Sequence, residues 1–242
     1  IVRLSADPNG SGNGYLYVIG QGSLPAVFNA PADDADLTQI NNLPAADGDN
    51  QPGAPFTATA RTVGIENYSP WAITIDEVNN ILYYTSNGFY VSVPGETIQD
   101  IKAWDLTGEA QLPNVGSITL IASVNPGLRG LDFVTGVGIF VCNGNVVQLI
   151  NASTGALIRT YTPSLPEFSL CLVDVKATGD GTKIWVADLF TTQVFLFDVA
   201  TGTEILTFQP YGHPGTFNQI AVYAEDTPPT PSGTIIVEKV VT

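Results

Sequence analysis

Hydrophobic and polar residues alternate along this chain in short runs, and the runs recur in a fixed order. Residues 137–161 read VGIFVCNGNVVQLINASTGALIRTY, and residues 184–208 read IWVADLFTTQVFLFDVATGTEILTF. The two segments align without a gap at an offset of 47 residues. Alternation with a period of two predicts β-strands, and the Gly- and Asn-rich positions between the runs predict tight turns.

Further copies of this pattern begin at the apolar residues Ile73, Leu131, Val173 and Ile220. Each full copy reads as four strands, with Asp or Asn before the turn that joins the third strand to the fourth. These residues are Asp105, Asn151 and Asp198. Their side chains can hydrogen-bond the local backbone, and the glycine that ends each turn accepts a positive φ. A repeat of this length predicts an all-β fold, a β-propeller of about four to five four-stranded blades.

The first 64 residues are interpreted as a diverged copy of the repeat. Its expected strands are Ile1–Ser5, Tyr15–Ile19, Ala26–Asn29 and Phe56–Val63. The segment Ala30–Pro55 is rich in Ala, Asp, Asn, Gly and Pro, so we expect a long surface loop there. The second copy is expected to carry insertions around Phe89–Gln99 and Glu109–Gly116.

The C-terminal end changes character after the expected propeller domain, residues 1–225. Residues 226–233 form a Pro-rich linker, and residues 234–242 read as one more β-strand. Its apolar residues are Ile235, Ile236, Val237, Val240 and Val241. Three interpretations stay open: a donor strand that adds to the sheet edge of a neighbouring subunit, a strand of the last blade, or the start of a further module. For the third, the segment resembles the opening strand of a Cna-B or prealbumin-like module.

Two stretches carry a resemblance to known repeat families. Pro70–Asp76, followed by Ile81–Thr85, resembles the NHL repeat, and Ile184–Asp188 with Gln193–Asp198 is similar to the YVTN-type repeat of surface proteins. The resemblance covers residues 70 to 224 and implies a secreted or surface β-propeller. Because such repeats occur in enzymes, scaffolds and adhesins alike, it does not determine the function.

Composition narrows the classes of partner. Hydrophobic residues make up 44% of the chain and charged residues 13%, with a formal net charge of −15. Nucleic acids and anionic membranes attract basic surfaces, so neither is an expected partner. No apolar run approaches the roughly 20 residues that span a bilayer. The chain contains no Met and begins with Ile1, which we interpret as a mature secreted chain, extracellular or at the cell surface.

Cysteine and asparagine residues offer two modifications that fit an extracellular location. Cys142 and Cys171 lie in strands that can sit in neighbouring blades, so they either form a disulfide or remain two buried thiols. Asn9 and Asn151 each begin an Asn-x-Ser sequon and are candidate glycosylation sites.

Two groups of oxygen-bearing residues are candidates for binding Ca²⁺, the one cofactor that we consider. Alternate positions of the first hairpin turn carry Asp7, Asn9, Ser11 and Asn13, which suit calcium in number but include a single carboxylate; the alternative is a simple turn. Asp132 and Asp174 fall on the expected inner strands, where they could face a central channel and hold Ca²⁺, as in propeller lactonases.

No motif in the sequence specifies a reaction. The single histidine, His213, lies between Pro and Gly residues in a predicted loop, and no Gly-x-Ser-x-Gly motif is present. We therefore expect an extracellular binding or structural module rather than an enzyme, a subunit of a surface or filamentous assembly joined by strand addition, with a protein as partner. The alternatives are a Ca²⁺-dependent hydrolase or lyase at the channel mouth, and a propeller that binds carbohydrate.

Overall fold

The computed structural model describes most of the predicted repeat region. Side chains are described for residues 72–85, 97–108, 110–121, 127–164, 170–210, 220 and 222. The backbone alone is described for residues 2–5, 14–20, 35–43, 60–65, 221, 223 and 234–236. All structural statements below concern these residues.

The described strands form four four-stranded antiparallel sheets and one two-stranded sheet. Sheet 1 contains β1 (Val2–Ser5), β2 (Gly14–Gly20), β3 (Ala35–Leu43) and β4 (Ala60–Ile65). Sheet 2 contains β5 (Ile73–Asp76), β6 (Ile81–Thr85), β7 (Ile98–Asp105) and β8 (Ala110–Thr119). Sheet 3 contains β9 (Leu128–Val134), β10 (Gly138–Asn143), β11 (Val146–Ile150) and β12 (Leu157–Tyr161). Sheet 4 contains β13 (Leu172–Ala177), β14 (Lys183–Asp188), β15 (Val194–Asp198) and β16 (Glu204–Phe208), and β17 (Ala221–Tyr223) pairs with β18 (Thr234–Ile236).

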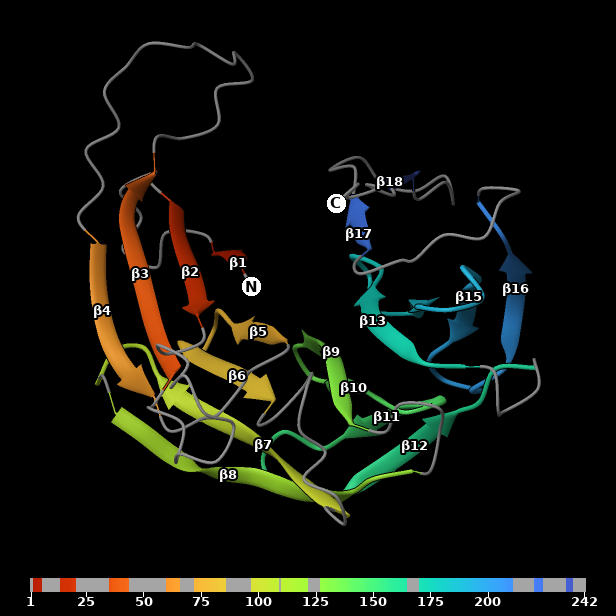
Figure 1. Ribbon diagram of the computed structural model, residues 1–242, viewed down its shortest axis with the longest axis horizontal. Helices are drawn as coiled ribbons and strands as arrows, with labels where there is room; N and C mark the ends of the chain where they lie inside the picture. Colours follow the sequence, from red (N-terminus) through yellow and green to blue (C-terminus); the bar gives the residue numbers. More distant parts are fainter. Residues whose placement is uncertain are drawn as a thin grey trace, which may run out of the picture.

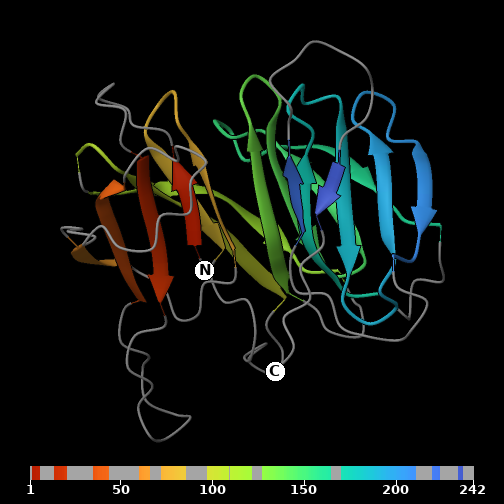
Figure 2. The ribbon, with the colours of Figure 1, turned by 90° about the horizontal axis from the view of Figure 1, so that it is seen from above.

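The sheets are arranged in chain order around a common centre, like the blades of a fan (Figures 1 and 2). The first strand of each sheet is the innermost, so β1, β5, β9, β13 and β17 follow one another side by side. Every four-stranded sheet continues outward in chain order to its last strand. The fold is therefore an all-β propeller, which confirms the fold class expected from the repeat.

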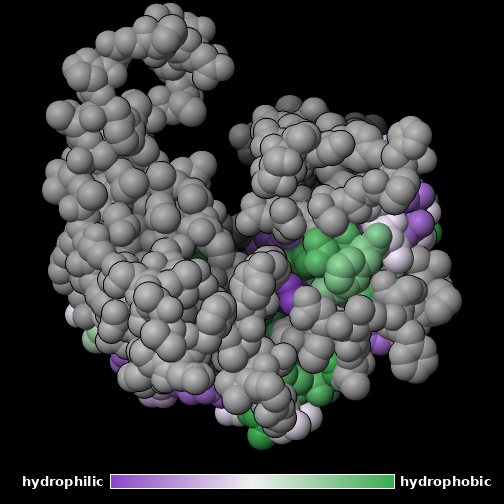
Figure 3. Space-filling view, viewed as in Figure 1, coloured by the Kyte–Doolittle hydropathy of each residue, from purple (hydrophilic) through white to green (hydrophobic). Residues whose placement is uncertain are grey.

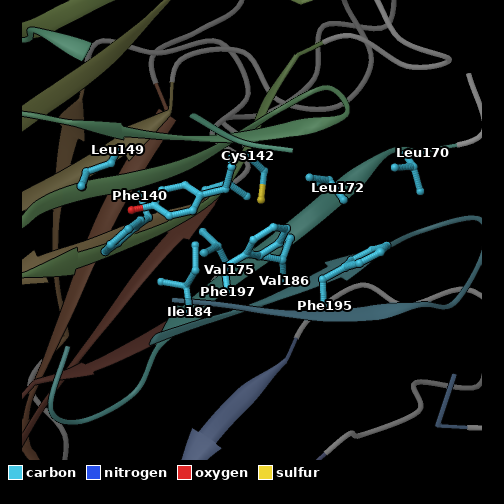
Figure 4. Packing of buried hydrophobic residues seen from close by; sticks show 12 residues of the cluster. Phe140, Cys142, Leu149, Leu170, Leu172, Val175, Ile184, Val186, Phe195 and Phe197 are labelled. Carbon is cyan, nitrogen blue, oxygen red and sulfur yellow. The ribbon is translucent and has the colours of Figure 1, made fainter. Parts of the chain in front are cut away.

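Apolar side chains fill the spaces between neighbouring sheets because each strand alternates its side chains between the two faces of its sheet. Between sheets 3 and 4, residues of β10 and β11 face residues of β13, β14 and β15 (Figure 4). Tyr161 contacts Phe197 there with a ring-centroid separation of 5.8 Å. A second cluster joins sheets 2 and 3, and a third joins sheet 4 to Ile220 and Val222. The core thus consists of layers between blades.

The turns between third and fourth strands have the chemistry expected from the repeat. Oδ1 of Asp105 accepts hydrogen bonds from the backbone N–H of Thr107 and Gly108, at 2.8 and 2.9 Å. Asn151 and Asp198 accept equivalent backbone bonds in their own turns. These polar side chains replace the ladder partners that the backbone lacks at a turn, so a structural role is sufficient for them.

The structure corrects the gapless alignment of the two best copies. Ile139 pairs with Ile150 in sheet 3, whereas Ile184 pairs with Phe197 in sheet 4, so the offset is 45 residues before the turn and 47 after it. The turn between the second and third strands is accordingly two residues longer in sheet 4. The insertion is not visible in the sequence because an insertion of two residues keeps the alternation of apolar and polar residues in phase.

Two segments expected to be irregular are strands. The strand β3 lies inside the predicted loop Ala30–Pro55, and the strand β8 covers most of the predicted insertion Glu109–Gly116. In both cases the strand is formed by pairing with distant neighbours: β3 pairs with β2 and β4, and β8 pairs with β7. Context of this kind overrides the weak β-propensity of Asp, Asn and Gly.

The other expectations for sheet 1 divide into two groups. The first two strands lie where they were expected, and the fourth strand, β4, overlaps the predicted Phe56–Val63. The predicted third strand, Ala26–Asn29, lies outside the described residues, as does the expected insertion around Phe89 up to residue 96.

The start of the C-terminal strand pairs within its own chain. Ile235 lies opposite Val222 and Ile236 lies opposite Ala221 in the antiparallel β17–β18 ladder. The pairing covers three residues of the segment 234–242, whose three interpretations stay predictions. Val237, Val240 and Val241 lie outside the described residues, as does the Pro-rich linker.

Candidate functional site

Asp132 and Asp174, the candidates for a central metal site, each bond to the next innermost strand. Oδ2 of Asp132 accepts a hydrogen bond from the backbone N–H of Ala177 at 2.8 Å, and Oδ2 of Asp174 accepts one from the N–H of Ile220 at 2.9 Å. In sheet 2 the hydroxyl oxygen of Thr74 accepts a bond from the N–H of Phe133 at 3.0 Å. Polar side chains on β5, β9 and β13 therefore bond to β9, to β13 and to the residue just before β17, respectively.

Asp174 also forms an ion pair with Lys176. Nζ of Lys176 donates to Oδ1 of Asp174 at 2.8 Å, and the backbone N–H of Val175 donates to the same oxygen at 3.0 Å. Burial raises the pKa of the Asp174 carboxyl above its ordinary value, against the opposing effects of the charge of Lys176 and its hydrogen bond. A buried charge of this kind persists only when it is paired and hydrogen-bonded, as it is here.

The calcium expectations stay predictions. Within the described residues, no group of three or more His, Cys, Asp or Glu side chains is arranged to hold a metal ion. The first candidate set, Asp7, Asn9, Ser11 and Asn13, lies outside the described residues, and so does His213.

Cys142 and Cys171 are both buried free thiols in the structure, the second alternative that the sequence allowed. They belong to different apolar clusters: Cys142 packs between sheets 3 and 4, and Cys171 packs between sheet 4 and Ile220. Burial raises the pKa of both thiols, most strongly that of Cys142. The guanidinium of Arg129, which is itself fully buried, opposes this shift at each thiol.

The two glycosylation candidates have different outcomes. Asn151 lies in the turn after β11, where it is half-buried and where its Oδ1 accepts the backbone N–H of Ser153 and Thr154, each at 2.9 Å. Asn9 lies outside the described residues. Glycosylation of either residue stays a prediction.

The outer strand of sheet 4 presents apolar side chains to solvent. Ile205 is 49% exposed and Leu206 is 45% exposed, and Phe208 is half-buried against the edge of Trp185. We call these three residues of β16 the β16 surface. On the face drawn in Figure 3, apolar side chains of the described residues reach the surface over sheet 4. The other exposed large apolar residues among those described are Val78, Ile98, Leu157, Ile158 and Phe190.

The β16 surface lies on a strand with an open edge. Among the described strands, β16 pairs with β15 alone and is the last strand of its sheet. Natural proteins usually protect such edges with charges, Pro residues or bulges, because an unpaired row of N–H and C=O groups can pair with another chain. The ladder between β15 and β16 has a register shift beside Leu206, and Glu204 begins the strand, so this edge has some of that protection. The exposed side chains of Ile205 and Leu206, more than the open edge itself, identify a candidate interaction site.

A second exposed feature is the turn Leu189–Thr192, which contains the two extra residues of sheet 4. Oδ2 of the buried Asp188 accepts the N–H of Phe190 at 3.1 Å and the N–H of Thr191 at 2.6 Å. Thr192 has a φ of 56°, which is unfavourable for a β-branched residue, and the side-chain amide of Gln209 donates to its hydroxyl at 2.7 Å. These bonds fix the backbone of the turn that carries the exposed Phe190.

Sequence reasoning missed both exposed features. The repeat alignment places Ile205 and Leu206 in an outer strand, and a charge-free apolar pair on an outer strand was the available signal. Phe190 could have been found only by recognising the insertion in its turn, which the gapless alignment hid. The part of the chain that the structure describes contains no helix long and apolar enough to cross a membrane.

Comparison with known proteins supports the architecture and leaves the family open. No family model matches the sequence, and no curated protein matches it. One chain of a nidogen/laminin complex has a similar structure, with a TM-score of 0.53 and 15% sequence identity over 81% of this chain and 59% of that chain. The structure of U3-55K is similar with a TM-score of 0.54 and 13% identity over 90% of this chain and 53% of that one. The chain thus spans little more than half the length of either protein, and at these identities the likeness concerns the β-propeller fold.

Proposed function

We propose that this chain is a β-propeller module that binds other proteins, outside the cell or at its surface, as a subunit of an assembly. The observation that carries this proposal is the β16 surface, where Ile205 and Leu206 are about half exposed on an open strand edge. Exposed apolar residues that gather on one edge commonly mark an interaction site.

The geometry favours strand addition as the mode of binding. The free edge of β16 offers backbone N–H and C=O groups to an extended segment of a partner, while the apolar side chains supply contact area. Such a partner gains main-chain hydrogen bonds without any rearrangement of the rigid sheet. The resemblance of the repeat to NHL and YVTN-type sequences agrees with a surface location.

The two carboxylates considered for a calcium site at the centre of the propeller are used to join sheets. The carboxylates of Asp132 and Asp174 accept backbone hydrogen bonds that join sheets, which is a structural use of both groups. No observation among the described residues favours the calcium-dependent hydrolase or the carbohydrate-binding propeller over a protein-binding module.

Site-specific crosslinking in the source organism tests the proposal. A photoreactive phenylalanine analogue at position 206 should form adducts whose partner is identified by mass spectrometry, whereas the same analogue at position 78 should not. Val78 is a control because it is 70% exposed but lies in the turn between β5 and β6 and not on a strand edge. The proposal fails if position 206 forms no adduct with any protein. A protease added to intact cells should degrade the chain if it is at the surface.

A further inference from the structure

The turn between β11 and β12 carries the Asn-x-Ser sequon that begins at Asn151. Oδ1 of Asn151 accepts the backbone N–H of Ser153 and that of Thr154, each at 2.9 Å. These two bonds fix the orientation of the side-chain amide, because its oxygen can accept them and its nitrogen cannot. The amide therefore holds the turn through one of its two polar atoms only.

The other polar atom, Nδ2 of Asn151, is accessible. Among the described residues it has no hydrogen-bond partner, and it is not one of the buried polar atoms that lack one, so it reaches solvent. Ser153, two residues further along the turn, is exposed. The nitrogen that a glycan would occupy and the hydroxyl residue of the sequon are thus both at the surface, as a modified turn requires.

The equivalent turns of sheets 2 and 4 show that the turn itself does not require asparagine. Oδ1 of Asp105 and Oδ1 of Asp198 accept backbone N–H groups of their own turns at 2.8 or 2.9 Å. A carboxylate oxygen thus makes the same kind of bond, and a charged acceptor makes it stronger. What Asn151 adds is an amide nitrogen, and Ser153 adds a hydroxyl where sheet 4 has Ala200. Both additions are components of the sequon and neither is needed for the turn.

We propose that Nδ2 of Asn151 carries an N-linked glycan, attached by an enzyme of the source organism that recognises the sequon. In this reaction Nδ2 forms a bond to the anomeric carbon of a sugar, and the bond between that carbon and a phosphate oxygen of a lipid-linked donor breaks. The lipid phosphate leaves with the electron pair of the broken bond, and the proton that Nδ2 loses goes to a base of the enzyme. The product keeps Oδ1, so the bonds that hold the turn are retained.

A glycan at this position protects the open edge of β12. Like β16, β12 is the last strand of its sheet, and Leu157 and Ile158 on it are 55% and 50% exposed. The backbone N–H of Asn151 donates to the carbonyl of Ala156 at 2.9 Å, so the glycan emerges beside the start of this strand. A bulky, hydrated glycan hinders the addition of another chain there, whereas the turn before β16 has Asp198 and no sequon. This consequence rests on the proposed function, because it explains why β16 and not β12 receives the partner.

Mass spectrometry of the chain purified from its source organism tests the proposal. We expect the peptide that contains Asn151 to be heavier than its sequence by the mass of a glycan and to release sugar ions on fragmentation. Asn151→Asp and Ser153→Ala should each abolish the added mass, and Ser153→Thr, which keeps a hydroxyl, should retain it. The first two substitutions introduce the residues that sheet 4 has at these positions, Asp198 and Ala200, so we expect both variants to fold.

The outcomes separate this inference from the proposed function. An unmodified Asn151 in the native chain overturns the inference, and so does an added mass that survives Asn151→Asp; adducts at position 206 would still support the proposed function. A photoreactive analogue at position 158 tests the protection of β12, and we expect more adducts in Asn151→Asp than in the glycosylated chain. Equal yields would contradict the protection. Circular dichroism with thermal melting shows whether each variant is folded.

Discussion

The carboxylate of Asp132 and the backbone N–H of Ala177 are joined at 2.8 Å, although the two residues belong to the innermost strands of neighbouring sheets. Asp132 is 6% exposed, so its carboxylate is satisfied by hydrogen bonds from the protein. This bond helps fix the position of sheet 4 against sheet 3 at the centre of the propeller.

Asp132→Ala should therefore destabilise the fold. Loss of a hydrogen bond to a buried charged acceptor typically costs about 2 kcal/mol, and the N–H of Ala177 would lose its partner. Asp132→Asn retains a carbonyl oxygen as acceptor, and we expect a smaller loss of about 1 kcal/mol. Urea unfolding followed by tryptophan fluorescence measures both. Equal stability of the wild type and Asp132→Ala would show that this bond contributes nothing.

Asp174 predicts a pH dependence of stability with a definite sign. Burial raises the pKa of its carboxyl in the folded state above the ordinary value of 3.8. The unfolded chain then ionises first, so the contribution of this group is fully present below the unfolded pKa and is lost as pH rises through the folded pKa. Asp174→Asn removes the ionisation.

The free energy of unfolding of the wild type minus that of Asp174→Asn should accordingly decrease as pH rises from about 4 toward neutral. Urea unfolding of both proteins at several pH values gives this difference without reference to other titrating groups. A difference that grows with pH would mean that the ion pair with Lys176, and not burial, dominates the pKa of Asp174.

Alanine substitutions at two glycines with similar φ angles distinguish the cost of close packing from the cost of backbone strain. Gly155 has a φ of +70°, and a Cβ atom there would stand 2.2 Å from the Val115 carbonyl oxygen, whereas Gly136 has a φ of +77° and no atom within 4 Å of the Cβ position. Gly136→Ala should cost about 1 kcal/mol from the left-handed backbone alone. Gly155→Ala should cost about 2–4 kcal/mol, since it also pushes sheets 2 and 3 apart. Equal losses in urea unfolding would rule out close packing at Gly155.

The sequence was sufficient to predict the repeated blade and its turns, because both depend on local patterns. Alternation predicts the strands, and Asp105 and Asp198 lie before turns where their side chains bind the backbone. The strand β3 could not be predicted, since its Asp and Asn residues favour a loop and only pairing with β2 and β4 makes it a strand. The two extra residues in the turn of sheet 4 could not be predicted either, because the apolar and polar residues of the flanking strands alternate in the same phase in both copies.

The candidate site was less predictable than the fold for a related reason. Asp132 and Asp174 were located on the innermost strands from the alignment, but their role depends on which N–H groups the next sheet brings near them. The exposure of Leu206 depends on what covers β16, and this is a property of the next blade. The gapless alignment already places Leu206 and Arg159 at the same position of the repeat. The exposure of Leu206 is known only from the structure.

The two cysteines should behave as protected thiols. Both are buried, and burial raises the pKa of each, so the reactive thiolate is scarce in the folded protein. We expect a thiol reagent at pH 8 to label neither residue in native protein and to label both in urea. The intact mass after alkylation in urea should be the same with and without prior reduction. Labelling in urea that requires a reductant would instead demonstrate a disulfide between Cys142 and Cys171.

Calcium should not stabilise the protein through the central carboxylates. An ion at Oδ2 of Asp132 and Asp174 would compete with the N–H groups of Ala177 and Ile220, and Oδ1 of Asp174 already accepts from Lys176 and Val175. We therefore expect the melting temperature in millimolar Ca²⁺ to equal that in a chelator, because a ligand that binds the native state raises it. A higher melting temperature in Ca²⁺ that Asp174→Asn abolishes would place the ion at the centre and favour the hydrolase. A rise that survives Asp174→Asn and disappears in Asp7→Ala would place calcium in the first hairpin turn and leave the centre structural.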